Sequence, residues 1–504
     1  MPQTKQLPMR QLSATDAAFI YSDTAHANSN VSLLHIYDQT TAPHGVVRFK
    51  QILTHLENRL EQMPVLRQKV LRVPLDLDYP YWVEDENFDI EYHVRHIALP
   101  KPGDWRQFCI QASRIHARPL DLQRPLWEMY VIEGLDSFLD LPVGSFAVLL
   151  KIHHAAVDVA SGHLITALMH DDTDHTPKAP PPAPWFPQEA PGNLSLMWRA
   201  GCHAASFPLR MMEPLSKGLG LMGLTFKTFI NEFLQLPESF PLTRFNTVVS
   251  PHRVFDTRRF NLADFRQIKG LVRGASINDV VLAVCAGGLR RYLMLQHELP
   301  ENSLVAAAPI NVRDKAAHGG SNCFAWARVN LFTQIADPVQ RLQLINDTTS
   351  SSEVIRNAMG ARELNDISRH APSAAIFMSS KLLRAASARL GDWTPLANCT
   401  ITNVPGPQHP LYLLGARLTY LSAIMPIADG MGLVFSVTSY NEMLVISFTS
   451  CYEQLPDPQA LAQCLRDSFQ EYLGLAGGLQ TGTDKAKARP RRKISRKASS
   501  DPVA

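Results

Sequence analysis

A dense cluster of prolines near the middle of the chain constrains its fold more than any other feature. The run at 176–191 reads TPKAPPPAPWFPQEAP. Proline lacks a backbone N–H and has a fixed φ, so clustered prolines fit neither a helix interior nor a central strand. The chain has 504 residues, whereas a typical domain has roughly 100 to 200. We therefore expect two folded units joined by a linker.

Both sides of this linker show alternating strand and helix patterns, which predicts a mixed α/β fold. The run at 145–152, SFAVLLKI, is almost continuously apolar, as expected of a strand buried on both faces. Helix periodicity occurs at 105–116 and 338–363. The segment 49–71, interrupted at Pro64, predicts a helix followed by a strand. Further strand-like segments lie at 81–96, 129–133, 304–311, 324–332, 400–403, 431–439 and 444–451.

These patterns give four ranges: an N-terminal domain at 1–175, a linker with candidate interfacial helices at 176–245, a C-terminal domain at 246–476 and a disordered basic tail at 477–504. Within the second range, the stretch 207–234 mixes Leu, Met and Phe with lysines. It could lie in a membrane interface or form a pair of core helices. The tail contains KAKARPRRKISRK, which indicates a solvated segment or one attracted to anionic lipid headgroups. Since no aromatic residues are interleaved with these charges, we do not expect nucleic-acid binding.

The remaining composition favours a cytoplasmic protein. The seven cysteines are scattered and form no CxxC pair, which argues against a zinc or redox motif. The first residues lack the apolar core of a secretory signal. No uninterrupted apolar run reaches the ~20 residues that span a bilayer. We expect reduced thiols and no transmembrane segment.

The candidate catalytic residues follow the buried strand at 145–152, in the sequence KIHHAAVDVASGH. Side chains alternate along a strand, so His153 and His154 point to opposite sides and only one can face a given cleft. Asp158 follows His154 by four residues, and a carboxylate near an imidazole raises its pKa and can fix its tautomer. A single imidazole can take a hydroxyl proton and return it to a leaving thiolate. A purely structural histidine pair is the alternative that the pattern alone leaves open.

Other motifs have structural explanations of equal or greater weight. In SINDVV, Ser276 and Asp279 fit the capped start of a helix. TNVPGP at 402–407 fits a strand end followed by a turn, although Asn403 could donate to a substrate oxygen. The two histidines and three aspartates at 169–175 fit a solvated loop better than a metal site. The chain has neither a GxSxG elbow nor a GxxxxGK[ST] loop, which argues against a serine hydrolase and a P-loop enzyme.

The run HHAAVD resembles the HHxxxDG signature of the bacterial wax ester synthase/diacylglycerol acyltransferase family, part of the CoA-dependent acyltransferase superfamily. The resemblance extends over most of the chain except the termini and the linker region. Its blocks occur in order: LSATDAAF at Leu12, PVLRQK at Pro64, FDIEYHVRHIALPKPG at Phe88, RPLDLQRPLWEMYVIEGL at Arg118, SINDVVLAVCAGGLRRYL at Ser276, PINVR at Pro309, ITNVPGP at Ile401 and SVTSYNEMLVISFTSCYEQLPD at Ser436.

This resemblance implies an α/β fold with two chloramphenicol acetyltransferase-like domains, each a mixed β-sheet flanked by helices, and an active site at their interface. It implies transfer of a fatty acyl group from acyl-CoA to a long-chain alcohol or diacylglycerol. Acyl-CoA is then a co-substrate, and neither a cofactor nor a metal is needed. The implied location is cytoplasmic, on the periphery of a membrane or lipid inclusion.

The family's roles carry over to matching positions. His154 is implied to be the general base, Asp158 to hold the local geometry and His153 to support it. Asn278 and Asp279 are implied to lie near the active site.

One departure is that Val159 stands where the family motif has Gly. A β-branched residue resists φ > 0 and adds bulk. Glu442 likewise replaces a common turn glycine. Two alternatives therefore remain: a catalytically weakened acyl-CoA or lipid-binding homologue, and an acyltransferase acting on another hydroxyl or an amine.

Overall fold

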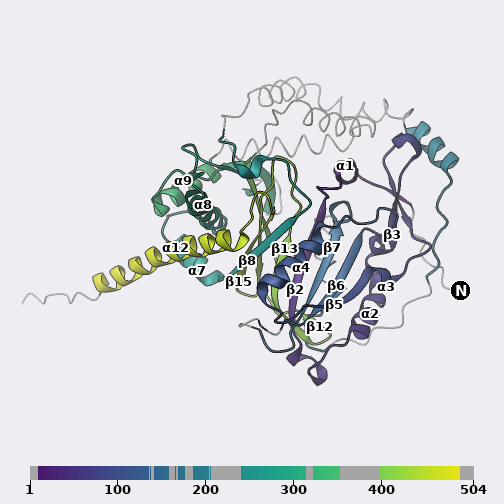
Figure 1. Cartoon of the computed structure of the whole chain (residues 1–504), viewed down its shortest axis with the longest axis horizontal. Coiled ribbons are helices and arrows are strands. Elements are labelled where there is room, and N and C mark those ends of the chain that lie inside the picture. Colours follow the sequence, from purple (N-terminus) through teal and green to yellow (C-terminus); the bar gives the residue numbers. More distant parts are fainter. Residues whose placement is uncertain are drawn as a thin grey trace, which may run out of the picture.

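Two six-stranded mixed β-sheets lie next to each other in the computed structural model and carry most of the helices on their faces (Figure 1). The structure describes residues 9–135, 137, 141–157, 165, 168–175, 185–203, 205, 240–313, 322–351 and 397–487. The predicted α/β class with two mixed sheets is confirmed.

The first sheet is built mainly from the N-terminal half of the chain. Only β5 and β6 are parallel neighbours in it; the other pairs are antiparallel. Its strands, in spatial order, are β12 (Tyr412–Leu413), β13 (Ala416–Ile424), β2 (Asn30–Asp38), β7 (Phe146–His153), β6 (Trp127–Glu133) and β5 (Val94–Ala98).

The second sheet belongs to the C-terminal half, and β11 runs parallel to both of its neighbours. Its spatial order is β10 (Asn322–Asn330), β9 (Val305–Arg313), β11 (Cys399–Pro405), β14 (Val434–Tyr440), β15 (Met443–Cys451) and β8 (Arg253–Asn261). A small third sheet contains β1 (Arg10–Gln11), β4 (Tyr81–Glu84) and β3 (Gln68–Leu71).

Helices flank these sheets on both sides of the linker. The N-terminal ones are α1 (Ala14–Ser22), α2 (Phe49–Glu57), α3 (Ile90–His93) and α4 (Trp105–Ala117). The C-terminal ones are α7 (Leu262–Lys269), α8 (Ile277–Leu295), α9 (Pro338–Thr349) and α12 (Pro458–Lys487). α12 extends through Lys487, past the boundary at 477 that we expected for a disordered tail.

The C-terminal half of the chain contributes two strands, β12 and β13, to the first sheet. β13 comes from the C-terminal half but pairs with β2, from Arg417 opposite Asp38 to Ile424 opposite Ser32. The sequence division at 246–476 did not anticipate this crossover. The pairing of β13 with β2 connects the two units through backbone hydrogen bonds as well as through side-chain packing.

β7 lies at the centre of the first sheet, between β2 and β6. Val148, Leu150 and Ile152 belong to one apolar core, whereas Ala147 and Leu149 pack in a second core with residues of α4. All residues of β7 are buried. This two-sided burial explains the continuous apolar run in the sequence and confirms the predicted strand, which ends at His153.

α8 is the central helix of the second unit, and thirteen of its residues are buried. It packs closely against α12 at Gly288, where an added Cβ would lie 2.6 Å from Leu465 Cδ2. A glycine at this position therefore allows the two helices to approach.

Candidate active site at the end of β7

The histidine pair lies where β7 ends and a single 3-10 turn begins. The backbone N–H of His153 donates to the Leu126 carbonyl at 2.9 Å, and that of His154 donates to the Ser29 carbonyl at 2.8 Å. These bonds tie the strand end to the segments that lead into its two neighbours, β6 and β2. The backbone position of both histidines is thus set from both sides of the sheet.

Both ring nitrogens of His153 are engaged within the protein. Nδ1 accepts from the backbone N–H of Ala155 at 3.1 Å, so the ring proton is on Nε2, which lies 3.0 Å from Asp23 Oδ2. The other oxygen of Asp23 accepts from the Ser29 N–H at 2.8 Å. The His153 ring is fully buried. It therefore has no free nitrogen with which to take a substrate proton.

The neighbouring imidazole has a different environment. The His154 ring is partly buried and stacks on the Phe19 ring, with centroids 4.0 Å apart and an angle of 23° between the planes. Burial lowers the pKa of His154 below its ordinary 6.5, against a hydrogen bond from the ring to the backbone of His154 itself. The imidazole is therefore mostly neutral at neutral pH, and one of its nitrogens then has a lone pair that can accept a proton.

α1 supplies the wall against which this ring packs. The helix begins at Ser13, whose hydroxyl accepts from the Asp16 N–H at 3.1 Å, which is a typical N-cap. Phe19 is two turns further along on this helix. The carboxylate of Asp16 raises the pKa of His154, and the neighbouring His153 lowers it. Both effects are smaller than that of burial.

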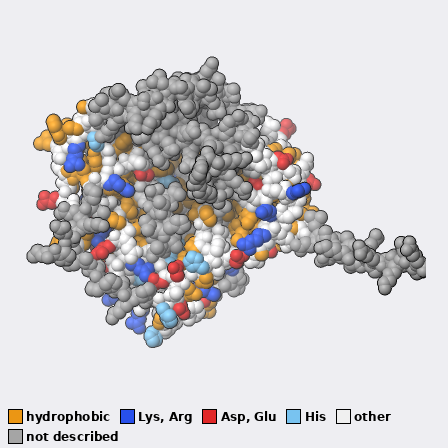
Figure 2. All heavy atoms as spheres, turned by 180° about the vertical axis from the view of Figure 1, so that it is seen from behind, with side chains coloured by type: hydrophobic (Ala, Val, Ile, Leu, Met, Phe, Trp, Pro, Cys, Tyr) orange, Lys and Arg blue, Asp and Glu red, His pale blue; other side chains and the backbone are white. Residues whose placement is uncertain are grey.

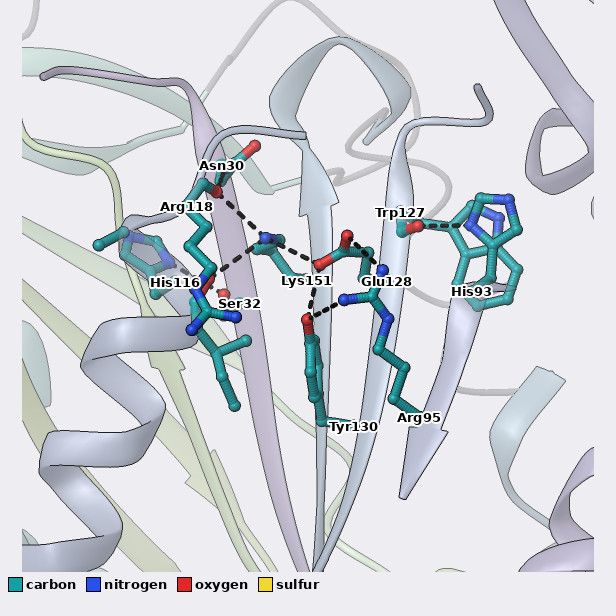
Figure 3. Close-up of polar contacts among 12 residues, drawn as sticks. Asn30, Ser32, His93, Arg95, His116, Arg118, Trp127, Glu128, Tyr130 and Lys151 are labelled. Carbon is teal, nitrogen blue, oxygen red and sulfur yellow. Dashed lines mark hydrogen bonds and ion pairs between the residues drawn. The ribbon is translucent and has the colours of Figure 1, made fainter. Parts of the chain in front are cut away.

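A buried polar network crosses the first sheet at Lys151, two residues before His153 on β7 (Figure 3). Ser32, Lys151 and Glu128 are register partners on β2, β7 and β6. The Lys151 side chain has no exposed surface, and its Nζ donates to Glu128 Oε2 at 3.0 Å and to the carbonyls of Ile115 and Arg118 at 3.2 and 3.1 Å. The ammonium thus binds two carbonyls at the C-terminal end of α4.

Glu128 balances this cation and bridges to β5. Its Oε2 also accepts from the Tyr130 hydroxyl at 3.0 Å, and its Oε1 accepts from Arg95 at 3.3 Å. Burial acts to raise the pKa of Glu128, but Lys151, Arg95 and Tyr130 together hold it below its ordinary value. Burial lowers the pKa of Lys151, although Glu128 opposes this. Lys151 is therefore protonated and Glu128 ionised at neutral pH, and the two form a buried ion pair.

The structure places Asn278 and Asp279 in the first turn of α8. Asp279 forms the expected capping box: Oδ2 accepts from the backbone N–H and the hydroxyl of Ser276 at 2.7 and 2.8 Å. Its Oδ1 accepts from the Thr349 hydroxyl at 2.7 Å. Asp279 is buried, and these contacts give it a structural role, whereas Asn278 is partly exposed.

The other predicted site residues are not brought against His154 by any described hydrogen bond. Asn403 lies partly buried on β11, opposite Val437 on β14. Asp158 and Val159 lie outside the described residues. Among the residues that are described, neither Asn278 nor Asn403 hydrogen-bonds to His154.

Three supporting residues escaped the sequence reasoning: Phe19, Asp23 and Lys151. Phe19 lies in the LSATDAAF block, which we noted only for its resemblance to a family. Asp23 pairs with a histidine 130 positions away. The lysine interrupts an otherwise apolar strand, and this charge within SFAVLLKI is the one signal that could have identified it.

Within the described part of the chain, no cluster of three or more His, Cys, Asp or Glu side chains is arranged to hold a metal ion. That part also contains no helix with the length and apolar character needed to cross a membrane.

Comparisons with known proteins agree on one family. A model of the wax ester synthase/diacylglycerol acyltransferase catalytic domain matches residues 12–281, and one of the WS/DGAT C-terminal domain matches residues 320–472. A Mycobacterium tuberculosis protein, provisionally named a diacylglycerol O-acyltransferase, is 33% identical over 468 residues, which cover 92% of this chain and 90% of that protein. A second one from this organism is 31% identical and covers 94% and 99% of the two chains.

Solved structures show the same fold. The wax ester synthase/diacylglycerol acyltransferase from Marinobacter aquaeolei VT8 superposes with a TM-score of 0.65 at 25% identity, covering 93% of this chain and all of that one. The first condensation domain of the calcium-dependent antibiotic synthetase gives a TM-score of 0.52 at 13% identity, covering 94% and 97% of the two chains. The latter likeness concerns the fold alone.

Proposed function

Since the chain belongs to the wax ester synthase/diacylglycerol acyltransferase family, we propose that it transfers a fatty acyl group from acyl-CoA to the hydroxyl of a long-chain alcohol or a diacylglycerol. The products are CoA and a wax ester or triacylglycerol. Both substrates bind together, and His154 acts directly on the hydroxyl.

The free nitrogen of His154 removes the hydroxyl proton as the oxygen attacks the thioester carbonyl. The new C–O bond forms a tetrahedral oxyanion, and collapse of this species breaks the C–S bond. The imidazolium then gives its proton to the sulfur, which leaves as the CoA thiol, so the histidine ends neutral. General acid–base catalysis of this kind contributes about 10²- to 10⁴-fold to a rate.

One observation carries this assignment: in the described part of the chain both ring nitrogens of His153 have partners, whereas no side chain hydrogen-bonds to the His154 ring. His153 uses both nitrogens within the protein. Burial lowers the pKa of His154, so the neutral form that can accept a proton predominates at neutral pH. His153 then supports the strand end, and Asp158 has the role of holding the local geometry.

Two amides are candidates for substrate contacts. Asn278 lies in the first turn of α8, where the helix dipole favours negative charge, so we assign it to the oxyanion. Asn403 is our candidate for a contact with a substrate oxygen. Asp279 supports Asn278 indirectly by capping the helix that carries it.

An exposed apolar surface supports peripheral association with a membrane or lipid inclusion. Residues 193–203 are helical, and Leu194 and Trp198 are 86% and 76% exposed. Leu196 on the same helix is buried against the small third sheet. Nearby, Leu75 is 83% exposed and has φ +59°, a strained conformation for a leucine. Figure 2 shows hydrophobic side chains gathered at this corner of the molecule.

This surface would place the enzyme where long-chain acceptors are dissolved. Exposed aromatic and aliphatic side chains bind at the boundary between headgroups and acyl chains. We expect the double variant Leu194→Ser/Trp198→Ser to co-sediment less with phosphatidylglycerol/phosphatidylcholine vesicles than the parent chain does. Leu295→Ser, at a 64% exposed leucine of the second unit, is the matched control.

The reaction is tested by CoA release from palmitoyl-CoA, with hexadecanol, a diacylglycerol, an amine or no acceptor. We expect release that depends on a hydroxyl acceptor, and a loss of about 10²- to 10⁴-fold in kcat for His154→Gln. Undiminished turnover in that variant would remove His154 from the mechanism. Activity that appears only in Val159→Gly would favour a catalytically weakened homologue, and a preference for the amine would change the acceptor class.

A further inference from the structure

The contact between Phe19 and His154 restricts the χ2 torsion of the His154 side chain. Hydrogen bonds to Ser29 and Leu126 fix the backbone of the strand end. The ring itself turns about the χ2 torsion, whose energy profile is broad for histidine. A flat neighbour at stacking distance narrows that rotation, and Phe19 lies against the imidazole face at 4.0 Å.

We infer that Phe19 is a positioning residue, which holds the plane of the His154 imidazole so that its free nitrogen stays directed at the reacting hydroxyl. This inference rests on the proposed role of His154 as the base. It makes α1 part of the catalytic apparatus, although no residue of that helix takes part in the proposed chemistry.

α1 is suited to this role because its C-terminal end is bound to the same strand end. The helix ends at Ser22, whose hydroxyl donates to the Phe19 carbonyl at 3.0 Å. Asp23 follows directly and binds both the His153 ring and the Ser29 N–H. The Ser29 carbonyl accepts from the backbone N–H of His154. One hydrogen-bonded loop therefore connects Phe19 with His154. These bonds hold the backbones that carry the two stacked rings in a fixed relation to each other.

The phenyl ring acts on the protonation of His154 in two opposite ways. Its bulk excludes water, which favours the neutral imidazole, whereas its face attracts an imidazolium. The pKa of His154 is lowered, so exclusion of water outweighs the other effects. Among the described residues, the charged or titratable groups that act on the ring are Asp16 on α1, which raises the pKa of His154, and the adjacent His153, which lowers it.

The experiment separates the shape of the Phe19 ring from its bulk. Phe19→Tyr retains the aromatic face, Phe19→Leu keeps apolar cover without a flat face, and Phe19→Ala removes both. Phe49→Leu is a matched control, because Phe49 also stacks on a histidine, His96, with centroids 4.9 Å apart and planes at 9°, at the β5 edge of the sheet. The full-length chain is assayed with palmitoyl-CoA and hexadecanol.

We expect Phe19→Leu to lower kcat by about 10- to 100-fold with KM changed by less than about threefold, because a misplaced reacting group costs rate and not affinity. Phe19→Tyr should retain most of kcat, and Phe49→Leu should match the parent chain. In Phe19→Ala the acid limb of the kcat profile should move to higher pH as water reaches the imidazole.

A ring-current measurement tests the stack without reference to turnover. In ¹³C-histidine-labelled protein, the His154 Cε1–H signal is identified by its absence in His154→Gln, and it should move downfield in Phe19→Leu but not in Phe19→Tyr. Unchanged kcat in Phe19→Leu, or an unmoved signal, overturns the positioning role. If His154→Gln stays active, the proposed base is wrong instead, and the two failures are distinguishable.

Discussion

Replacing Lys151 by Met should destabilise the protein by roughly 4 kcal/mol, because it removes the buried ammonium that the Glu128 carboxylate and the C-terminal end of α4 share. Lys151 has no exposed side-chain surface and lies 3.0 Å from Glu128. Methionine has a similar length, so the change removes the charge without opening a large cavity. The effect therefore reports on polar contacts and not on lost packing.

The size of this destabilisation follows from the hydrogen bonds that each partner of Lys151 retains in the variant. Breaking a buried ion pair by removing one partner costs about 3 to 5 kcal/mol, and Glu128 keeps Arg95 and Tyr130, which places this cost near 3. The Arg118 carbonyl still accepts from the Asn30 amide at 3.1 Å. The Ile115 carbonyl, in the last turn of α4, loses its side-chain donor, which adds about 1 kcal/mol.

The assay is equilibrium urea unfolding, with tryptophan fluorescence and far-UV circular dichroism required to give coincident transitions. The double variant Lys151→Met/Glu128→Met should recover about half of the loss, since neither charge then remains buried alone. Arg266→Met breaks the exposed ion pair with Glu442 and should leave the unfolding midpoint unchanged. A loss below about 1 kcal/mol for Lys151→Met would refute the reasoning.

Three further predictions concern pH and helix packing. Turnover should persist on acidification past pH 6.5 and fall only at lower pH, because burial lowers the pKa of His154 and protonation removes the base; an acid limb above 6.5 would contradict this. Burial lowers the pKa of His116 to about 3 and that of His55 to about 4, so below pH 6.5 the unfolded state binds more protons. The free energy of unfolding should then fall by about 1.4 kcal/mol per pH unit for each histidine, down to its folded pKa, and a flat urea midpoint between pH 6.5 and 4.5 would count against this. Gly288→Ala should lower the free energy of unfolding in urea by about 1 to 3 kcal/mol, because the added methyl group would meet α12. Gly474→Ala has open space around the added Cβ and should stabilise the protein slightly. Equal effects of the two variants would exclude the close contact between the helices.

Segments whose pattern arises from their own burial were predictable from sequence. The strand at 145–152 was found because both of its faces are apolar, and the helix at 105–116 matches α4 to within one residue. The segment 81–96 was wrong as a single strand: Asp89 accepts from the Glu91 N–H and starts the short α3, which divides β4 from β5. We predicted a strand because the segment is rich in aromatic and β-branched residues, and we did not recognise Asp89 as a helix N-cap.

Features that depend on distant pairing were not predictable. The pairing of β13 with β2 depends on the free edge that β2 offers in the first sheet, and nothing local in Ala416–Ile424 specifies this. The partner of His153 is likewise 130 positions away. The alternation of side chains that we used for His153 and His154 stays a prediction, because β7 ends at His153 and His154 begins a 3-10 turn.

The buried ion pair near the candidate active site serves to position structural elements more than to stabilise the protein. Apolar residues of similar shape often stabilise a protein as much as a buried ion pair does, or more. The role of Lys151 and Glu128 is therefore to fix the position of α4 on the sheet. The ammonium binds two carbonyls at the end of α4, and the start of α4 reaches the second sheet through the Trp105 indole, which donates to Asp256 on β8 at 2.9 Å. One helix thus connects the strand that ends at the histidine pair with the unit that carries α8. A reaction that needs groups from both units requires such a fixed reference, because an error of about 1 Å in placing a reacting group costs about 100-fold in rate.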